Sequence, residues 1–309
     1  KYTERPGIVS LECGFHGRTL MAMSLTSKVK PYKFGFGPFA PEVYKVHSPY
    51  CYRCLFNATY PGCGLHCLEY VQRFLAAEAA AEKIAAVVVE VVQGEGGFIV
   101  CPKDFLLGLK ELCKQYGIVY IVDEIQTGFG RTGRMFASEH YGLEPDLMAL
   151  AKSIAAGLPL SAVVGRAEIM DAPAPGEVGG TYGGNPVSCA AALAAIDKVS
   201  ADDLPARARH IGQVMLERLT ALKEKYPLVG DVRGLGAMVG MELVRDRKTK
   251  EPATAQTSEI ISRCAAKGLI TLKAGIYDNV VRFLVPLVVT DEQLEWGLAV
   301  LESVVSEVA

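Results

Sequence analysis

The chain has 309 residues, of which 50% are hydrophobic and 21% are charged, and its net charge is −2. A chain of this length buries a large core, and we expect it to form two lobes. The near-neutral balance of scattered charges gives no indication of binding to nucleic acid or to anionic lipid. No uninterrupted apolar stretch approaches the length of a membrane-spanning segment. We therefore expect a globular protein without a nucleic-acid or membrane partner.

Nine cysteines are distributed along the chain. In a chain of this size such a distribution favours reduced thiols in a reducing compartment over a disulfide scaffold, so we expect a cytoplasmic protein. The sequence begins at Lys1 rather than at methionine and is organised from its first residues. We expect its natural N-terminus, with any targeting signal, to lie upstream.

Strand-like and helix-like segments alternate in the first two thirds of the chain. Residues 67–85 and 103–116 carry the apolar periodicity of helices. Apolar runs typical of buried strands occupy residues 86–92, 118–122 and 147–151. This alternation predicts an α/β fold with a mostly parallel sheet sandwiched by helices.

The pattern changes after the glycine-rich segment GGTYGGNP. Asn185 followed by Pro186 has the sequence of a helix N-cap with proline at the first helical position, and a long helical region follows. A smaller α+β unit comes next, and a helix that starts at Thr290 closes it. We place a large domain at residues 1–200 and a small C-terminal domain at residues 201–309, joined by the long helical region.

Three of the predicted strands lead into polar groups. Glu90 lies near the end of the first strand, with Gln93 and Glu95 after it. Asp123 and Gln126 follow the second strand, and Lys152 follows the third. Because ligands of open α/β sheets bind at the carboxyl ends of the strands, we expect these groups to face one crevice. A lysine in this position is usually a surface residue, but desolvation at the rim of an apolar sheet makes an amine nucleophilic.

Pyridoxal phosphate is the cofactor whose needs match these groups. It requires a lysine for a Schiff base and a carboxylate against its pyridine nitrogen, and Lys152 and Asp123 suit these two positions. Gln126 suits a hydrogen bond to the phenolic oxygen, and Phe15 suits stacking on the ring. Thr181 and the neighbouring backbone amides suit a contact with the phosphate.

Six segments, in order along nearly the whole chain, resemble the class III aminotransferases, and within them the 4-aminobutyrate (omega-amino acid) aminotransferases. The segments are FHGRT at 15–19, GFGPFAPEVY at 35–44, QGEGG at 93–97, DEIQTGFGRTG at 123–133, the strand before Lys152, and GTYGGNP at 180–186. The resemblance implies the type I fold of pyridoxal-phosphate-dependent transferases, which is the fold of aspartate aminotransferase.

The resemblance also implies roles for the cofactor site. Lys152 matches the lysine that forms the Schiff base and shuttles the proton between substrate and cofactor. Asp123 matches the partner of the pyridine nitrogen, and Gln126 matches the residue beside the ring hydroxyl. Phe15 matches the stacking aromatic residue, and His16 follows it as a supporting residue of the same loop.

Further implied roles concern the substrate and a second subunit. Thr181 resembles the threonine that reaches the phosphate of the neighbouring subunit's cofactor, which implies a homodimer with shared active sites. Arg282 matches the arginine that binds the substrate carboxylate through its guanidinium fork. Glu95 matches the glutamate that pairs with this arginine when the substrate offers no α-carboxylate, and we place Glu90 in the same substrate site.

The implied reaction is the transamination of an omega-amino acid, with 4-aminobutyrate as the first choice of donor and 2-oxoglutarate as the acceptor. Acetylornithine or ornithine transamination is an alternative on the same groups, and amino-acid racemisation or epimerisation is another. The family also has a long portion before FHGRT that helps to hold the phosphate. A chain without that portion is expected to bind the cofactor weakly and to turn over little, so an inactive fragment is a further alternative.

A cysteine cluster stands apart from these motifs. Cys51, Cys54, Cys63 and Cys67 have the spacing C-x2-C-x8-C-x3-C. The first pair has the spacing of ligands to zinc or to an iron–sulfur cluster. The loop between the pairs is short and the chemistry needs no metal, so we favour reduced structural thiols over a metal site.

Overall fold

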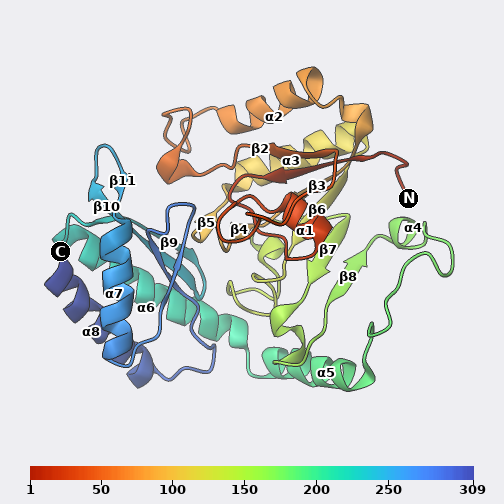
Figure 1. Cartoon of the computed structure of the whole chain (residues 1–309). Coiled ribbons are helices and arrows are strands. Elements are labelled where there is room, and N and C mark those ends of the chain that lie inside the picture. Colours follow the sequence, from red (N-terminus) through yellow and green to blue (C-terminus); the bar gives the residue numbers. More distant parts are fainter.

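A six-stranded sheet forms the centre of the larger unit in the computed structural model, which describes residues 1–309 (Figure 1). Its strand order is β2-β1-β3-β6-β7-β8, and only β8 runs antiparallel to its neighbour. The strands are β1 (Gly7–Leu11), β2 (Val43–Val46), β3 (Ile84–Val89), β6 (Val119–Asp123), β7 (Leu147–Leu150) and β8 (Ala162–Gly165).

Helices cover both sides of this sheet. Figure 1 shows α2 (His66–Ala77) and α3 (Lys103–Tyr116) together over one side, where they share a core of 23 buried residues with the strands. On the other side, α4 (Ala167–Met170) packs on β3 and β6, and α5 (Pro186–Ala201) packs against the turn that begins at Lys152. The sheet is open at its β8 edge, where Val163 and Val164 are both exposed.

A second unit is built around an antiparallel sheet with its own core of 21 buried residues. Its strands are β9 (Val229–Leu235), β10 (Met238–Asp246), β11 (Glu251–Pro252), β12 (Leu272–Ala274) and β13 (Val280–Phe283). Its helices are α6 (Leu204–Lys225), α7 (Thr254–Ala266) and α8 (Asp291–Val308). The two units have separate cores, and the domain boundary predicted near residue 200 stays a prediction.

Two short elements complete the larger unit. Helix α1 (Leu20–Leu25) lies beside β2, and a hairpin of β4 (Val92–Gln93) and β5 (Ile99–Val100) encloses the loop 94–97. None of the helices combines the length and the apolar composition that crossing a membrane requires.

Several predicted elements are confirmed. Helix α3 spans the predicted residues 103–116 and ends at Gly117 in the left-handed conformation. Thr290 and Gln293 form a reciprocal capping box at the start of α8. The helix predicted over 67–85 is shorter, because it ends at Ala77 and residues 84–85 already belong to β3.

The cap of α5 gives a stability prediction. The Asn185 Oδ1 accepts hydrogen bonds from the backbone N–H groups of Val187 and Ser188, at 2.9 and 3.2 Å. Asn185→Ala leaves these donors without a protein partner, and we expect the free energy of unfolding to fall by about 1 kcal/mol. Asn185→Ser, which keeps a capping oxygen, serves as the control. Equal stability of the two variants in urea denaturation would contradict the assignment of the cap.

Candidate active site

The parallel register brings three strand ends to one edge of the sheet. Asp123, the last residue of β6, pairs with Ala149 in β7, and Glu90 directly follows β3 on the other side. Lys152 follows β7 by two residues. Together with Phe15, His16, Glu95 and Gln126 these residues line one cavity of about 60 Å³. The crevice predicted from the strand ends is therefore present.

Asp123 is held by a buried ion pair. Its Oδ2 lies 2.8 Å from the His16 Nδ1, and its Oδ1 accepts a hydrogen bond from the Ile125 backbone N–H. Burial lowers the pKa of His16. The hydrogen bond to Asp123 and the charges of Glu90 and Asp123 raise this pKa by more than burial lowers it, so the net shift is upward. His16 therefore fixes the orientation of the Asp123 carboxylate and offsets its charge.

Glu90 connects two loops of the cavity. Its carboxylate accepts hydrogen bonds from the backbone N–H groups of Phe15, at 2.9 Å, and Gly94, at 3.0 Å. Burial raises the pKa of Glu90 to about 7, although His16 opposes the rise. These contacts fit a residue that positions the loops at 13–17 and 94–97, and the substrate contact predicted for Glu90 stays a prediction.

Lys152 occupies an unusual backbone conformation. It starts a short 3-10 turn (Lys152–Ala155) with φ of 49°, in the left-handed region that a lysine rarely adopts. Non-glycine residues in this region cluster at functional sites, where the surrounding structure maintains the strain. The expected desolvation of the amine is not seen, because Lys152 is exposed in this chain.

The groups around the cavity fit the ring of pyridoxal phosphate. The Oε1 of Gln126 is buried without a hydrogen-bond partner, and it lies so close to Gly94 that a side chain at 94 would meet it at 2.1 Å. The amide is therefore not committed to a protein partner through this oxygen, and after a half-turn its N–H group could serve as the donor that a phenolic oxygen requires. Phe15 presents an aromatic ring, and Asp123 presents a carboxylate for the pyridine nitrogen.

A second ion pair lies beside the cavity. Arg282, in β13 of the smaller unit, donates to the Glu95 carboxylate at 2.5 Å, and Tyr32 donates to the other Glu95 oxygen at 2.7 Å. Burial opposes ionisation of Glu95, but Arg282 and Tyr32 lower the pKa of this carboxyl below its usual value. Glu95, Arg282 and Lys152 also line a larger cavity of about 670 Å³ between the two units.

The remaining predicted residues lie elsewhere. Thr181 is exposed in the loop before α5 and does not line the cavity of its own chain. The four clustered cysteines and His66 line a small separate cavity of about 30 Å³, and all nine cysteines are free. No group of three or more His, Cys, Asp or Glu side chains is arranged to hold a metal ion.

Sequence reasoning missed three residues of the site. Tyr32 is bonded to Glu95, and the Arg18 guanidinium lies 4.5 Å from the centre of the Tyr32 ring. The FHGRT segment contains Arg18 and is the only signal that pointed to it. Glu124 is buried and accepts hydrogen bonds from the backbone of Ala137 and Ser138, which ties the loop after Asp123 in place. The only sign of Glu124 in the sequence is its place as the second residue of the DEIQ motif.

The comparison with protein families fits this arrangement. The family model described as Aminotransferase class-III matches residues 1–305. The chain therefore belongs to the class III aminotransferases. These are pyridoxal-phosphate-dependent transaminases of the type I fold, so the predicted family, fold, enzyme class and cofactor are confirmed.

Several relatives match nearly the whole chain. A probable 4-aminobutyrate aminotransferase of Bacillus subtilis (strain 168) is 50% identical, over 98% of this chain and 70% of the relative. The 4-aminobutyrate aminotransferase of Escherichia coli (strain K12) is 44% identical over 99% of this chain and 70% of its own length. A 5-aminovalerate aminotransferase of Pseudomonas putida is 43% identical over the same shares.

Among solved structures, a PLP-bound amine transaminase from an uncultivated Pseudomonas species superposes with a TM-score of 0.93. It is 35% identical, and the match covers 99% of this chain and 70% of that one. These relatives together support the assignment of the chain to the omega-aminotransferases.

The raised pKa of Glu90 predicts a pH dependence of stability. Its folded pKa of about 7 exceeds the usual 4.5, so the folded protein holds a proton that the unfolded chain releases between these values. The associated stability is full below about pH 4.5 and is lost as the pH rises through about 7. We expect Glu90→Gln to reduce that loss by on the order of 1–3 kcal/mol.

Thermal unfolding across this pH range provides the measurement. Glu111→Gln, at an exposed position of α3, is the matched control and is expected to follow the wild-type profile. A Glu90→Gln profile that coincides with the wild type would show that Glu90 does not hold this proton.

Proposed function

We propose that the chain transfers the amino group of an omega-amino acid to 2-oxoglutarate, with 4-aminobutyrate as the donor and Lys152 as the Schiff-base lysine. The observation that carries the proposal is the Glu95–Arg282 ion pair, which lines one cavity with Lys152. Arg282 can bind a substrate carboxylate, and Glu95 takes the place of that carboxylate when the substrate has none there. The names of the relatives support 4-aminobutyrate first and make 5-aminovalerate, another omega-amino acid, the second candidate donor.

The cavity residues divide the work around the cofactor. When bound, pyridoxal phosphate supplies an electron sink for the carbon that carries the substrate nitrogen. The Asp123 carboxylate, oriented by His16, would keep a proton on the pyridine nitrogen. Gln126 would donate to the phenolic oxygen, and Phe15 would cover one face of the ring. The Lys152 Nζ would take the proton from the substrate carbon that bears the nitrogen and deliver it to the C4′ carbon of the cofactor.

Arg282 and Glu95 adapt one pocket to two kinds of substrate. An omega-amino acid has no carboxylate next to the reacting carbon, so Arg282 stays paired with Glu95 while the donor is bound. 2-Oxoglutarate does have a carboxylate there, and a guanidinium fork binds it bidentately once Glu95 moves aside. The Tyr32 hydroxyl holds Glu95 in the paired position at 2.7 Å.

We further propose a homodimer and a cytoplasmic location. The exposure of Thr181 in its own chain supports a role of this residue at a partner's cofactor phosphate. Exposed apolar residues on α5, Val187 and Leu193, support a subunit contact nearby. The nine free cysteines support a reducing compartment.

Addition of pyridoxal phosphate tests the role of Lys152. We expect an absorption band at about 400–430 nm, where protonated Schiff bases of this cofactor absorb. Lys152→Ala is expected to lose the band, whereas Lys103→Ala, at an exposed lysine of α3, is expected to keep it. A band of undiminished intensity in Lys152→Ala would contradict the assignment.

Glu95→Gln tests the carboxylate switch. The amide cannot form the ion pair, so Arg282 is free in both half-reactions and binds the donor carboxylate unproductively. We expect kcat/KM for 4-aminobutyrate to fall about tenfold, while KM for 2-oxoglutarate is unchanged or lower. Glu78→Gln, at an exposed residue, is the control. Parallel losses in both half-reactions of Glu95→Gln would count against the switch.

A further inference from the structure

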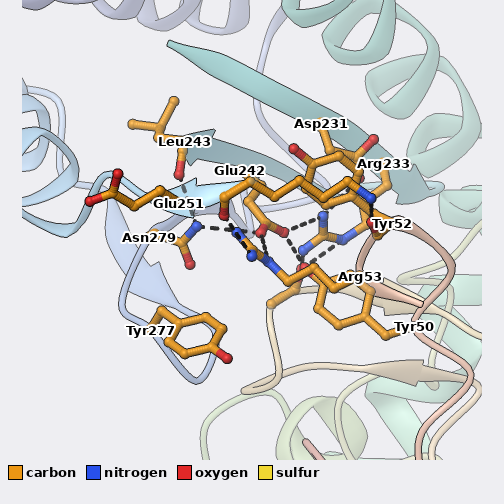
Figure 2. A network of polar contacts seen from close by, with 12 residues as sticks. Tyr50, Tyr52, Arg53, Asp231, Arg233, Glu242, Leu243, Glu251, Tyr277 and Asn279 are labelled. Carbon is orange, nitrogen blue, oxygen red and sulfur yellow. Dashed lines mark hydrogen bonds and ion pairs between the residues drawn. The ribbon is translucent and has the colours of Figure 1, made fainter. Parts of the chain in front are cut away.

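A buried polar network joins the smaller unit to loops of the larger one (Figure 2). At its centre is Glu242 of β10, whose side chain is 1% exposed. Arg53 and Arg233 form ion pairs with it, at 2.5 and 2.8 Å, and Tyr50 and Asn279 donate hydrogen bonds to it. Arg53 and Tyr50 come from the larger unit, and the other residues come from the smaller one.

Arg233 is the member of the network that reaches the active site. Its Nε and one terminal nitrogen donate to the Gly97 carbonyl oxygen, at 3.1 and 2.6 Å. Its other terminal nitrogen donates to Asp231 and Glu242, at 2.8 Å each, and its guanidinium carbon lies 4.9 Å from the centre of the Tyr50 ring. All three guanidinium nitrogens are therefore used, and two of them hold the loop that carries Glu95.

The Gly97 backbone is shaped for this contact. Its φ of 111° is in the region that L side chains avoid, and an added Cβ would lie 3.2 Å from Arg233 and 3.0 Å from Val280. The same loop is held at its start by Glu90, which accepts from the Gly94 N–H. Its middle is held by the Gly275 N–H, which donates to the Glu95 carbonyl.

We propose that Arg233 is a positioning residue that sets the reach of Glu95 toward Arg282, and so determines how the pocket divides its affinity between monocarboxylate donors and dicarboxylate acceptors. This inference rests on the proposed switch between Glu95 and Arg282. Glu95 lies two residues before Gly97, and Arg282 pairs in register with Gly240 of β10, the strand that also carries Glu242. Arg233 pairs with the same Gly240 from the other side, so Arg233 and Arg282 flank one residue of the sheet.

The position of Arg233 has opposite consequences for the two half-reactions. With Gly97 held, Glu95 competes with an incoming dicarboxylate for Arg282 and protects Arg282 from the donor carboxylate. With Gly97 released, Glu95 pairs less firmly with Arg282, so it competes less with the dicarboxylate and protects Arg282 less from the donor carboxylate. Dicarboxylates then bind more tightly, while omega-amino donors bind more often in an unproductive pose. A residue that only stabilised the fold would change both half-reactions in the same direction.

Arg233→Lys is the variant that tests this. A lysine keeps the positive charge between Asp231 and Glu242 but lacks the fork that also reaches the Gly97 carbonyl. Arg245→Lys is the matched control, because Arg245 lies on β10 and pairs with Glu251 at an exposed position. The proteins are measured with saturating pyridoxal phosphate, and binding of glutarate, a dicarboxylate that does not react, is followed by calorimetry.

We expect Arg233→Lys to bind glutarate about fivefold more tightly and to lose about fivefold in kcat/KM for 4-aminobutyrate. Arg245→Lys is expected to match the wild type. In a Glu95→Gln background, Arg233→Lys should change neither the affinity for glutarate nor kcat/KM for 4-aminobutyrate any further. If Arg233→Lys does not fold, Asp231→Asn loosens the same guanidinium and should shift both quantities in the same directions, by less.

The outcomes separate this inference from the proposed function. If Glu95→Gln weakens the donor half-reaction without weakening the acceptor half-reaction, and folded Arg233→Lys does not, the inference about Arg233 is wrong and the switch stands. If Arg233→Lys weakens both half-reactions in parallel, its role is structural and the inference is also wrong. If Glu95→Gln affects the donor and acceptor half-reactions equally, the proposed switch between Glu95 and Arg282 is itself wrong.

Discussion

The parallel register of β3, β6 and β7 is the constraint on which the site depends. Asp123 pairs with Ala149, so Glu90, Asp123 and Lys152 leave three adjacent strands at one edge of the sheet. Side chains alternate between the faces of a strand, so a slip of one residue would turn Asp123 away from His16. The core under α2 and α3 prevents such a slip, because it would bring the wrong residues of each strand into contact with these helices.

Two ionic centres share one loop. The carboxylate of Glu90 holds the start of the 94–97 loop beside the Asp123–His16 pair, and Glu95 in the same loop meets Arg282 from the smaller unit. The proposed cofactor site around Asp123 and the proposed carboxylate site at Arg282 are therefore linked through the backbone of the 94–97 loop. In the proposed function, this link lets contacts between the units, and not only residues inside the cavity, influence substrate choice.

The local part of this account was predictable from the sequence, and the long-range part was not. Gly117 ends α3, and the Thr290 cap starts α8, because these signals act within one turn of helix. Strand β13 ends at Phe283 although the apolar run continues to Val289, because the later residues of the run pack in the core of the second unit instead of extending the sheet. Tyr32 and Arg233 were missed, since their partners lie more than sixty residues away and no motif records that approach.

Chemical trapping of the cofactor tests the central claim, that Lys152 is the residue to which it is attached. Borohydride converts a Schiff base into a stable secondary amine, and peptide mass spectrometry then locates the modified lysine. Lys45 is the natural competitor, because burial lowers its pKa to about 8 and makes it the more nucleophilic kind of lysine. We predict the pyridoxyl group on the peptide that contains Lys152. A label on Lys45 or another lysine, with Lys152 unmodified, would contradict the account.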